Sequence, residues 1–97
     1  MTSQGDQVQE HRALVVLKNK YGLHARPSTL IAQTAKKFEA QVFLGKDGTE
    51  VDAKSIFGML TLAAECGATL SVRAKGKDAS EAVAKLSEVI SSFQAED

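Results

Sequence analysis

Short segments with the apolar pattern of a strand alternate along this chain with segments that have the apolar pattern of a helix. Few folds are compatible with this order. Apolar residues recur every three or four positions from Ala79 to Phe93, which indicates a helix with one buried face. Leu70, Val72 and Ala74 instead alternate with other residues, which indicates a strand with one buried face. Applied along the whole chain, the two patterns predict the element order βαββαβα.

The first half of the chain begins with a strand and a helix. The β-branched run from about Arg12 to Lys18 predicts a buried strand. A loop leads from there to His24, and Pro27 fits the first turn of the helix that follows. The expected apolar stripe of that helix comprises Leu30, Ile31, Thr34, Ala35 and Phe38.

The remaining boundaries follow from turn and capping residues. Short strands at 41–44 and 49–53 flank Lys46-Asp47-Gly48, and Asp-Gly between strands is a strong hairpin signal. Ser55 is expected to cap a short helix that ends at Leu62. Asp78 is expected to cap the last helix, with Glu81 in the capping-box position.

Strands this few and this close together do not suit a doubly wound parallel sheet. They predict an α+β fold of two layers, a four-stranded antiparallel sheet with three helices on one face. Residues 1–10 are polar and are expected to form a flexible N-terminal tail. Residues 11–97 are enough for a single domain and no more.

Charge and composition exclude several classes of function. The chain has 12 basic and 12 acidic residues, and this balance argues against a nucleic-acid partner. Its one cysteine, Cys66, allows no internal disulfide, which fits the cytoplasm. No apolar run approaches the roughly 20 residues that span a bilayer, so membrane insertion is not expected. Two histidines and one cysteine do not form a usual zinc site, and we expect neither a metal nor a cofactor.

The segment Gly22-Leu23-His24-Ala25-Arg26-Pro27 places a histidine at the start of a helix. The first turn of a helix has free N–H groups and a partial positive charge, so it binds phosphate well. Arg26 adds a guanidinium that can hold phosphate oxygens at two points. The alternative is that His24 is a solvated loop residue and Arg26 an ordinary surface charge.

Two runs resemble one known family. Residues 22–28, Gly-Leu-His-Ala-Arg-Pro-Ser, are similar to the active-site signature of the histidine-containing phosphocarriers, the HPr family of the bacterial phosphoenolpyruvate:sugar phosphotransferase system. Residues 52–62 resemble the regulatory serine region of that family, at a matching separation. The resemblance covers about residues 11–93 and implies an open-faced β-sandwich.

The resemblance also implies a function. Family members accept a phosphoryl group from phosphorylated Enzyme I on Nδ1 of the histidine, which corresponds to His24. They pass it to the A domains of sugar-specific transporter complexes, and Arg26 stabilises the phosphate. A carrier of this kind is consumed and regenerated, so we do not expect an enzyme in the strict sense. We expect a monomer.

Ser55 and the residues after it have two interpretations. Ser55 caps a helix, and the resemblance adds possible phosphorylation by a serine kinase/phosphorylase. At about 100° per residue, Ile56, Phe57 and Leu60 share one arc of the helix, whereas Met59 and Leu62 lie elsewhere. The resemblance implies that the first set is exposed for partner binding. The alternative is that all five apolar residues belong to the core.

Three questions stay open at the level of sequence. Tyr21 stands where many family members have a small polar residue that steadies the site. A regulatory paralogue, for example in a nitrogen-related relay, is an alternative that keeps His24. An RNA-binding domain is a further alternative for a four-stranded sheet backed by helices, although no strand has the aromatic residues typical of that class.

Overall fold

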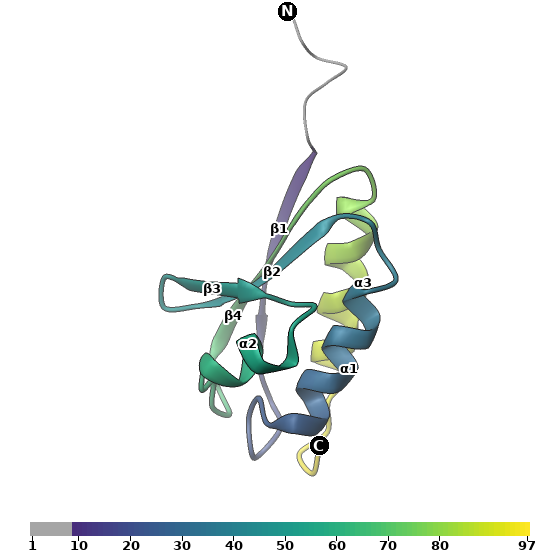
Figure 1. The fold of residues 1–97 in the computed structure, drawn as a ribbon. Helices are drawn as coiled ribbons and strands as arrows, with labels where there is room; N and C mark the ends of the chain where they lie inside the picture. Colours follow the sequence, from purple (N-terminus) through teal and green to yellow (C-terminus); the bar gives the residue numbers. More distant parts are fainter. Residues whose placement is uncertain (1–8) are drawn as a thin grey trace, which may run out of the picture.

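An antiparallel sheet of four strands forms one layer of the protein, and three helices form the other (Figure 1). The structure is a computed structural model and describes residues 9–97. The predicted order βαββαβα and the open-faced sandwich are confirmed. The elements are β1 (Glu10–Val16), α1 (Ala25–Ala35), β2 (Gln41–Lys46), β3 (Thr49–Asp52), α2 (Ile56–Thr61), β4 (Thr69–Lys75) and α3 (Ala79–Ser91).

The strands are arranged β1-β4-β2-β3, and every neighbouring pair is antiparallel. The predicted hairpin joins β2 to β3. Its two turn residues, Asp47 and Gly48, both have positive φ angles, of 52° and 85°, which is the pattern that twists a two-residue turn to match its strands. Because β4 lies between β1 and β2, β1 forms one edge of the sheet.

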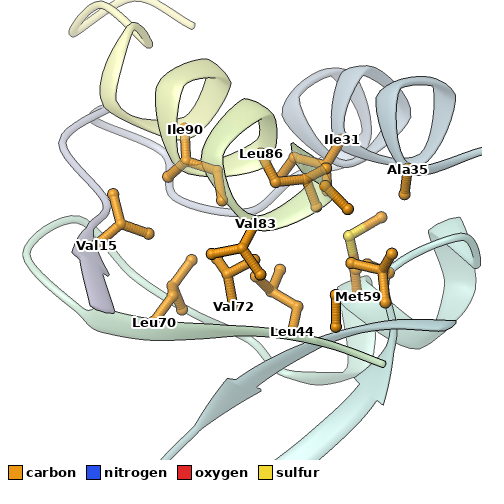
Figure 2. Close-up of a cluster of buried hydrophobic side chains, with 14 of the residues drawn as sticks. Val15, Ile31, Ala35, Leu44, Met59, Leu70, Val72, Val83, Leu86 and Ile90 are labelled. Carbon is orange, nitrogen blue, oxygen red and sulfur yellow. The ribbon is translucent and has the colours of Figure 1, made fainter. Parts of the chain in front are cut away.

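The hydrophobic core fills the space between the sheet and the helices (Figure 2). Leu70, Val72 and Ala74 of β4 are completely buried, as their alternation predicts. Helix α3 lies over them, and Leu86 and Ile90 are completely buried as well. Each such side chain contributes about 1.5–3 kcal/mol to stability on burial. The helical periodicity of α3 and the period-two pattern of β4 therefore bring their apolar faces together.

The first strand differs from its prediction. It begins at Glu10, inside the segment expected to be a tail; positions 1–8 of that segment lie outside the described residues. It is also not buried on both sides, because Leu14 is 70% exposed and Val16 is 44% exposed. The helices cover only one face of the sheet, so every second side chain of this continuous apolar run is left uncovered.

Helix α1 buries Ile31, Thr34 and Ala35 of the predicted stripe, but its buried face also includes residues that the prediction left out. Leu30 is 43% exposed, whereas Ser28 and Ala32 are buried beside Ile31 and Ala35. The buried face of α1 is thus centred on small side chains, which allow the helix to lie close to its neighbours. The predicted stripe did not include Ser28 and Ala32, because both side chains are small.

The predicted capping box of α3 is also wrong. Asp78 occupies the N-cap position, but its side chain makes no cap hydrogen bond. The carboxylate instead accepts hydrogen bonds from the main-chain N–H groups of Glu39 and Ala40, at 3.0 and 2.8 Å. These bonds, the one from Glu39 first, hold the pKa of Asp78 below its ordinary value. The side chain ties the start of α3 to the segment before β2.

Candidate functional site

The loop between β1 and α1, residues 17–24, ends in the histidine that the sequence singles out. Main-chain hydrogen bonds attach it to the segment before β4. The N–H of Leu17 donates to the oxygen of Ala68 at 2.9 Å, and the N–H of Leu23 donates to that of Ala64 at 3.0 Å. The loop is therefore fixed to the body of the protein on both sides of its tip.

Gly22 is needed for this attachment. Its φ angle is +68°, a region that residues with a Cβ rarely adopt. A Cβ on Gly22 would also clash with the main-chain oxygen of Ala64. That same oxygen accepts the hydrogen bond from Leu23, one residue before His24. Glycine here lets the loop approach the α2–β4 segment closely.

His24 is the N-cap residue of α1, as the sequence predicts. Its backbone is extended, with φ of −94° and ψ of −170°, and its oxygen accepts from the N–H of Ser28 at 3.1 Å. The side chain does not cap the helix and is half-buried. Ala25 and Arg26 follow in the first turn, where N–H groups have no partner within the helix. The imidazole thus lies next to free donors suited to phosphate oxygens.

Arg26 and Tyr21 lie on either side of His24 in the sequence. The side chain of Arg26 is exposed and forms no ion pair with residues 9–97. The ring of Tyr21 is 67% exposed and meets the ring of His24 edge to face, with centroids 6.1 Å apart. Lys20 lies 5.4 Å from the centroid of the Tyr21 ring. An aromatic and cationic surface therefore adjoins the imidazole.

The last residues of the chain also reach this loop, which the sequence analysis missed. Nε2 of His24 lies 2.8 Å from the main-chain oxygen of Asp97. The N–H of Lys20 donates to the main-chain oxygen of Ala95 at 2.8 Å. Figure 1 shows the β1–α1 loop, the start of α1 and the end of the chain at the same end of the molecule. No local pattern could reveal contacts between residues more than 70 positions apart.

Ser55 caps α2, as predicted. Its Oγ accepts a hydrogen bond from the N–H of Gly58 at 3.0 Å. Phe57 is 82% exposed, Leu60 is 36% exposed, and Met59 is completely buried. The alternative that all the apolar residues of this helix form core is therefore wrong.

Ile56 corrects the other interpretation of this helix. Its side chain is half-buried and packs against the core, although the helix geometry groups it with the exposed set. The exposed apolar surface on α2 therefore consists of Phe57 and Leu60, with Ile56 at its base.

The structure gives no sign of a metal site or a membrane-spanning segment within its described part. No group of three or more His, Cys, Asp or Glu side chains in residues 9–97 could hold a metal ion. Among the same residues, no helix is long and apolar enough to cross a membrane.

Comparison with known sequences assigns the chain to a family. Residues 12–92 match the family described as "PTS HPr component phosphorylation site", and this range contains both His24 and Ser55. The chain belongs to the HPr family. HPr proteins are phosphocarriers of the phosphotransferase system, and this chain is an HPr-family phosphocarrier.

Relatives of known identity agree with this assignment. The HPr-like protein Crh of Bacillus subtilis (strain 168) is 46% identical over 72 residues, which cover 74% of this chain and 85% of Crh. The phosphocarrier protein HPr of Xylella fastidiosa (strain 9a5c) is 44% identical over 80 residues, which cover 82% of this chain and 88% of that HPr.

Solved structures share the fold. The phosphocarrier protein HPr from Bacillus anthracis str. Ames superposes with a TM-score of 0.79 at 38% identity, over 84% of this chain and 96% of that HPr. A crystal structure of Bacillus subtilis Crh gives a TM-score of 0.69 at 41% identity, over 82% of this chain and 94% of Crh, and is described as an intertwined dimer with a swapped domain. Another Crh structure describes that protein as the catabolite repression HPr.

Proposed function

We propose that this protein accepts a phosphoryl group from phosphorylated Enzyme I on Nδ1 of His24 and passes it to A domains of sugar-specific transporter complexes. The observation that carries the proposal is the place of His24, at the N-cap of α1 and next to the free N–H groups of its first turn. Arg26 supplies a guanidinium that no ion pair with residues 9–97 engages. The first-turn N–H groups and the Arg26 guanidinium are therefore both available to an incoming phosphate.

The reaction is a direct transfer between nitrogens. The lone pair of Nδ1 attacks phosphorus while the bond from phosphorus to the donor imidazole breaks, and the electron pair of that bond returns to the donor ring. The first-turn N–H groups and Arg26 stabilise the negative oxygens of the moving group. The second transfer repeats these steps with His24 as the donor. The carrier is regenerated and needs no cofactor, so it does not act as an enzyme in the strict sense.

Phosphoenolpyruvate and Enzyme I test the proposal directly. The protein should gain one phosphoryl group by mass spectrometry, and acid should remove it, because a phosphoramidate is acid-labile whereas a phosphoserine ester is not. His24→Ala should gain none. His11→Ala is the matched control, since His11 is the other histidine and is exposed on β1. Labelling of the His24→Ala protein at the parent level would overturn the proposal.

Ser55 carries a second proposed role, as a regulatory phosphorylation site for a serine kinase/phosphorylase. Phe57 and Leu60 lie on the short helix that Ser55 caps and, together with Ile56, form the proposed docking surface for Enzyme I. The similarity to Crh, described as a catabolite repression HPr, favours a regulatory function as the second candidate. Transfer of label from His24 to a sugar-transporter A domain separates the two, because a purely regulatory protein would not deliver it.

We propose that the chain acts as a monomer in the cytoplasm. All seven residues of β1 pair with β4 of the same chain, from Glu10 opposite Lys75 to Val16 opposite Thr69. The swapped dimer described for Crh is the competing arrangement. Sedimentation equilibrium should give the monomer mass, and a stable dimer at micromolar concentration would contradict the proposal.

A further inference from the structure

We propose that Tyr21 is a docking and specificity-determining residue, whose ring enters a recess beside the phosphohistidine of Enzyme I. This role deepens the proposed function and rests on it. Tyr21 stands where many family members have a small polar residue and lies outside the run 22–28 that resembles the family signature. Its support is the place of the ring beside His24, the exposure of the ring, the turn that bears it and its cationic neighbour Lys20.

The ring of Tyr21 lies inside the area that any protein donor covers when it reacts with His24. The centroids of the two rings are 6.1 Å apart, and the ring planes are at 85° to each other. Even a small protein–protein interface covers about 600 Å² on each partner, which is a patch of about 14 Å in radius. A donor that brings its own histidine to His24 therefore covers Tyr21 as well, near the centre of the contact.

The exposure of Tyr21 makes its ring available for docking. The side chain is 67% exposed, so most of its surface is in contact with water before a partner arrives. Covering the ring removes this apolar surface from water, which favours the complex. Tyrosines near the centre of an interface are also among the residues that most often dominate binding. Tyr21 therefore stabilises the complex with a partner far more than it stabilises the fold.

A closed turn holds Tyr21 in this position. The turn is closed by two hydrogen bonds, from the N–H of Gly22 to the oxygen of Asn19 at 3.1 Å and from Nδ2 of Asn19 to the oxygen of Gly22 at 2.6 Å. The side chain of Asn19 is completely buried, so the base of the turn is anchored in the protein. A tyrosine on a fixed backbone loses little conformational entropy on docking. For the same reason the ring cannot move aside for a partner that has no recess for it.

Lys20 adds a positive charge to this contact. Its ammonium lies 5.4 Å from the centroid of the Tyr21 ring and forms no ion pair with residues 9–97. The attraction between a cation and an aromatic face increases once the pair is shielded from water. The partner surface that fits is therefore an apolar recess with a carboxylate at its rim, next to the phosphohistidine. A partner shaped for a small polar residue at this position has no such recess and clashes with the ring.

Transfer kinetics with phosphorylated Enzyme I from the same organism test this role. Tyr21→Ser should raise KM about tenfold while kcat stays within about twofold, because docking is weakened and the reacting groups are unchanged. Tyr21→Phe keeps the ring, so its KM should stay within about threefold of the parent value. Leu14→Ser is the matched control, because Leu14 is similarly exposed, at 70%, but lies on the face of the sheet that no helix covers. It should leave KM unchanged.

Two other donors separate docking and specificity from an effect on the imidazole. Phosphoramidate is too small to cover Tyr21, so it should phosphorylate Tyr21→Ser at a rate within about twofold of the parent rate. The second donor is an Enzyme I whose own carrier has a small polar residue at this position. Its kcat/KM should be about tenfold higher for Tyr21→Ser than for the parent, because the clash is removed. Lys20→Ala should raise KM for the first Enzyme I about threefold and make KM less dependent on salt.

The outcomes are distinguishable. Equal KM values for the parent and Tyr21→Ser would overturn the docking role, and an equal preference of both proteins for the two Enzyme I donors would overturn the specificity. A lower kcat together with slower reaction with phosphoramidate would also overturn the docking role, since the ring would then support the imidazole instead. If the parent gains no phosphoryl group from either Enzyme I, the proposed function itself fails, and the role of Tyr21 fails with it.

Discussion

The carboxylate of Asp78 accepts a hydrogen bond from the main-chain N–H of Ala40 at 2.8 Å, across 38 residues of sequence. The bond joins the residue before α3 to the residue before β2, and a second bond from Glu39 supports it. A residue that resembles a helix cap thus connects two separate elements. Its lowered pKa reflects the preference of both N–H groups for the ionised carboxylate.

Because of these two hydrogen bonds, the stability of the protein should decrease at low pH. Because the folded-state pKa of Asp78 is lowered, its contribution is present above the unfolded pKa, about 4, and is lost as pH falls through the lower folded value. Asp78→Asn should lower the melting temperature at pH 7, and the difference from the parent should shrink below about pH 4. Asp47→Asn removes the same charge from an exposed turn and should change the melting temperature little. A difference independent of pH would contradict this account.

Gly22→Ala should damage both the fold and the site. The added Cβ strains a positive φ and clashes with the oxygen of Ala64, so we expect a loss of about 3 kcal/mol or more in the free energy of unfolding. Gly67→Ala is the control, since Gly67 also has positive φ but nothing lies within 4 Å of its added Cβ; it should cost about 1–2 kcal/mol. Urea denaturation measures both. Equal losses would show that the contact with Ala64 is unimportant.

Arg26 should affect transfer without affecting stability. Arg26→Lys keeps one charge but loses the two-point grip on phosphate, so transfer should slow about tenfold. Arg26→Glu repels the phosphate and should slow it about a hundredfold or more. Melting temperatures should not change, because the side chain is exposed. Arg12→Lys, at an exposed position on β1, is the control in the same stopped-flow assay, and equal rates in all three proteins would make Arg26 an ordinary surface charge.

The two faces of α2 should respond differently to truncation. Phe57→Ala removes an exposed ring, so the free energy of unfolding should change by less than about 0.5 kcal/mol while KM for phosphorylated Enzyme I rises. Met59→Ala leaves a cavity in the core and should cost about 2–5 kcal/mol. If Phe57→Ala leaves KM unchanged, this surface does not dock Enzyme I.

Ser55 can be tested for regulation separately from capping. Ser55→Asp keeps an oxygen that can cap α2, so stability should stay within about 0.5 kcal/mol of the parent. Its charge beside Phe57 should raise KM for phosphorylated Enzyme I, because the charge must be desolvated on docking. Ser55→Ala loses the cap and should cost about 1 kcal/mol without changing KM. An unchanged KM in Ser55→Asp would leave Ser55 as a cap only.

The sequence by itself determined which helices and strands form, and it identified the Asp47-Gly48 turn and the Ser55 cap that mark some of their ends. The alternation at Leu70, Val72 and Ala74, the stripe of α3, the Asp47-Gly48 turn and the Ser55 cap each depend on residues within a few positions of one another. The motif from Gly22 to Ser28 also indicated the candidate site, because the residues that would bind phosphate are consecutive. Such local patterns express backbone geometry directly.

Only the tertiary structure decided what surrounds these elements. Leu14 is exposed because it lies on the face of the sheet that no helix covers, and its own run of apolar residues could not show that. Asp78 bonds to Ala40, and Asn19 and His24 meet the oxygen of Asp97, across 38 to 78 positions of sequence. These contacts use main-chain oxygens and N–H groups, which every residue type provides. Their partners are therefore chosen by how the sheet and helices pack, and no side-chain pattern records them.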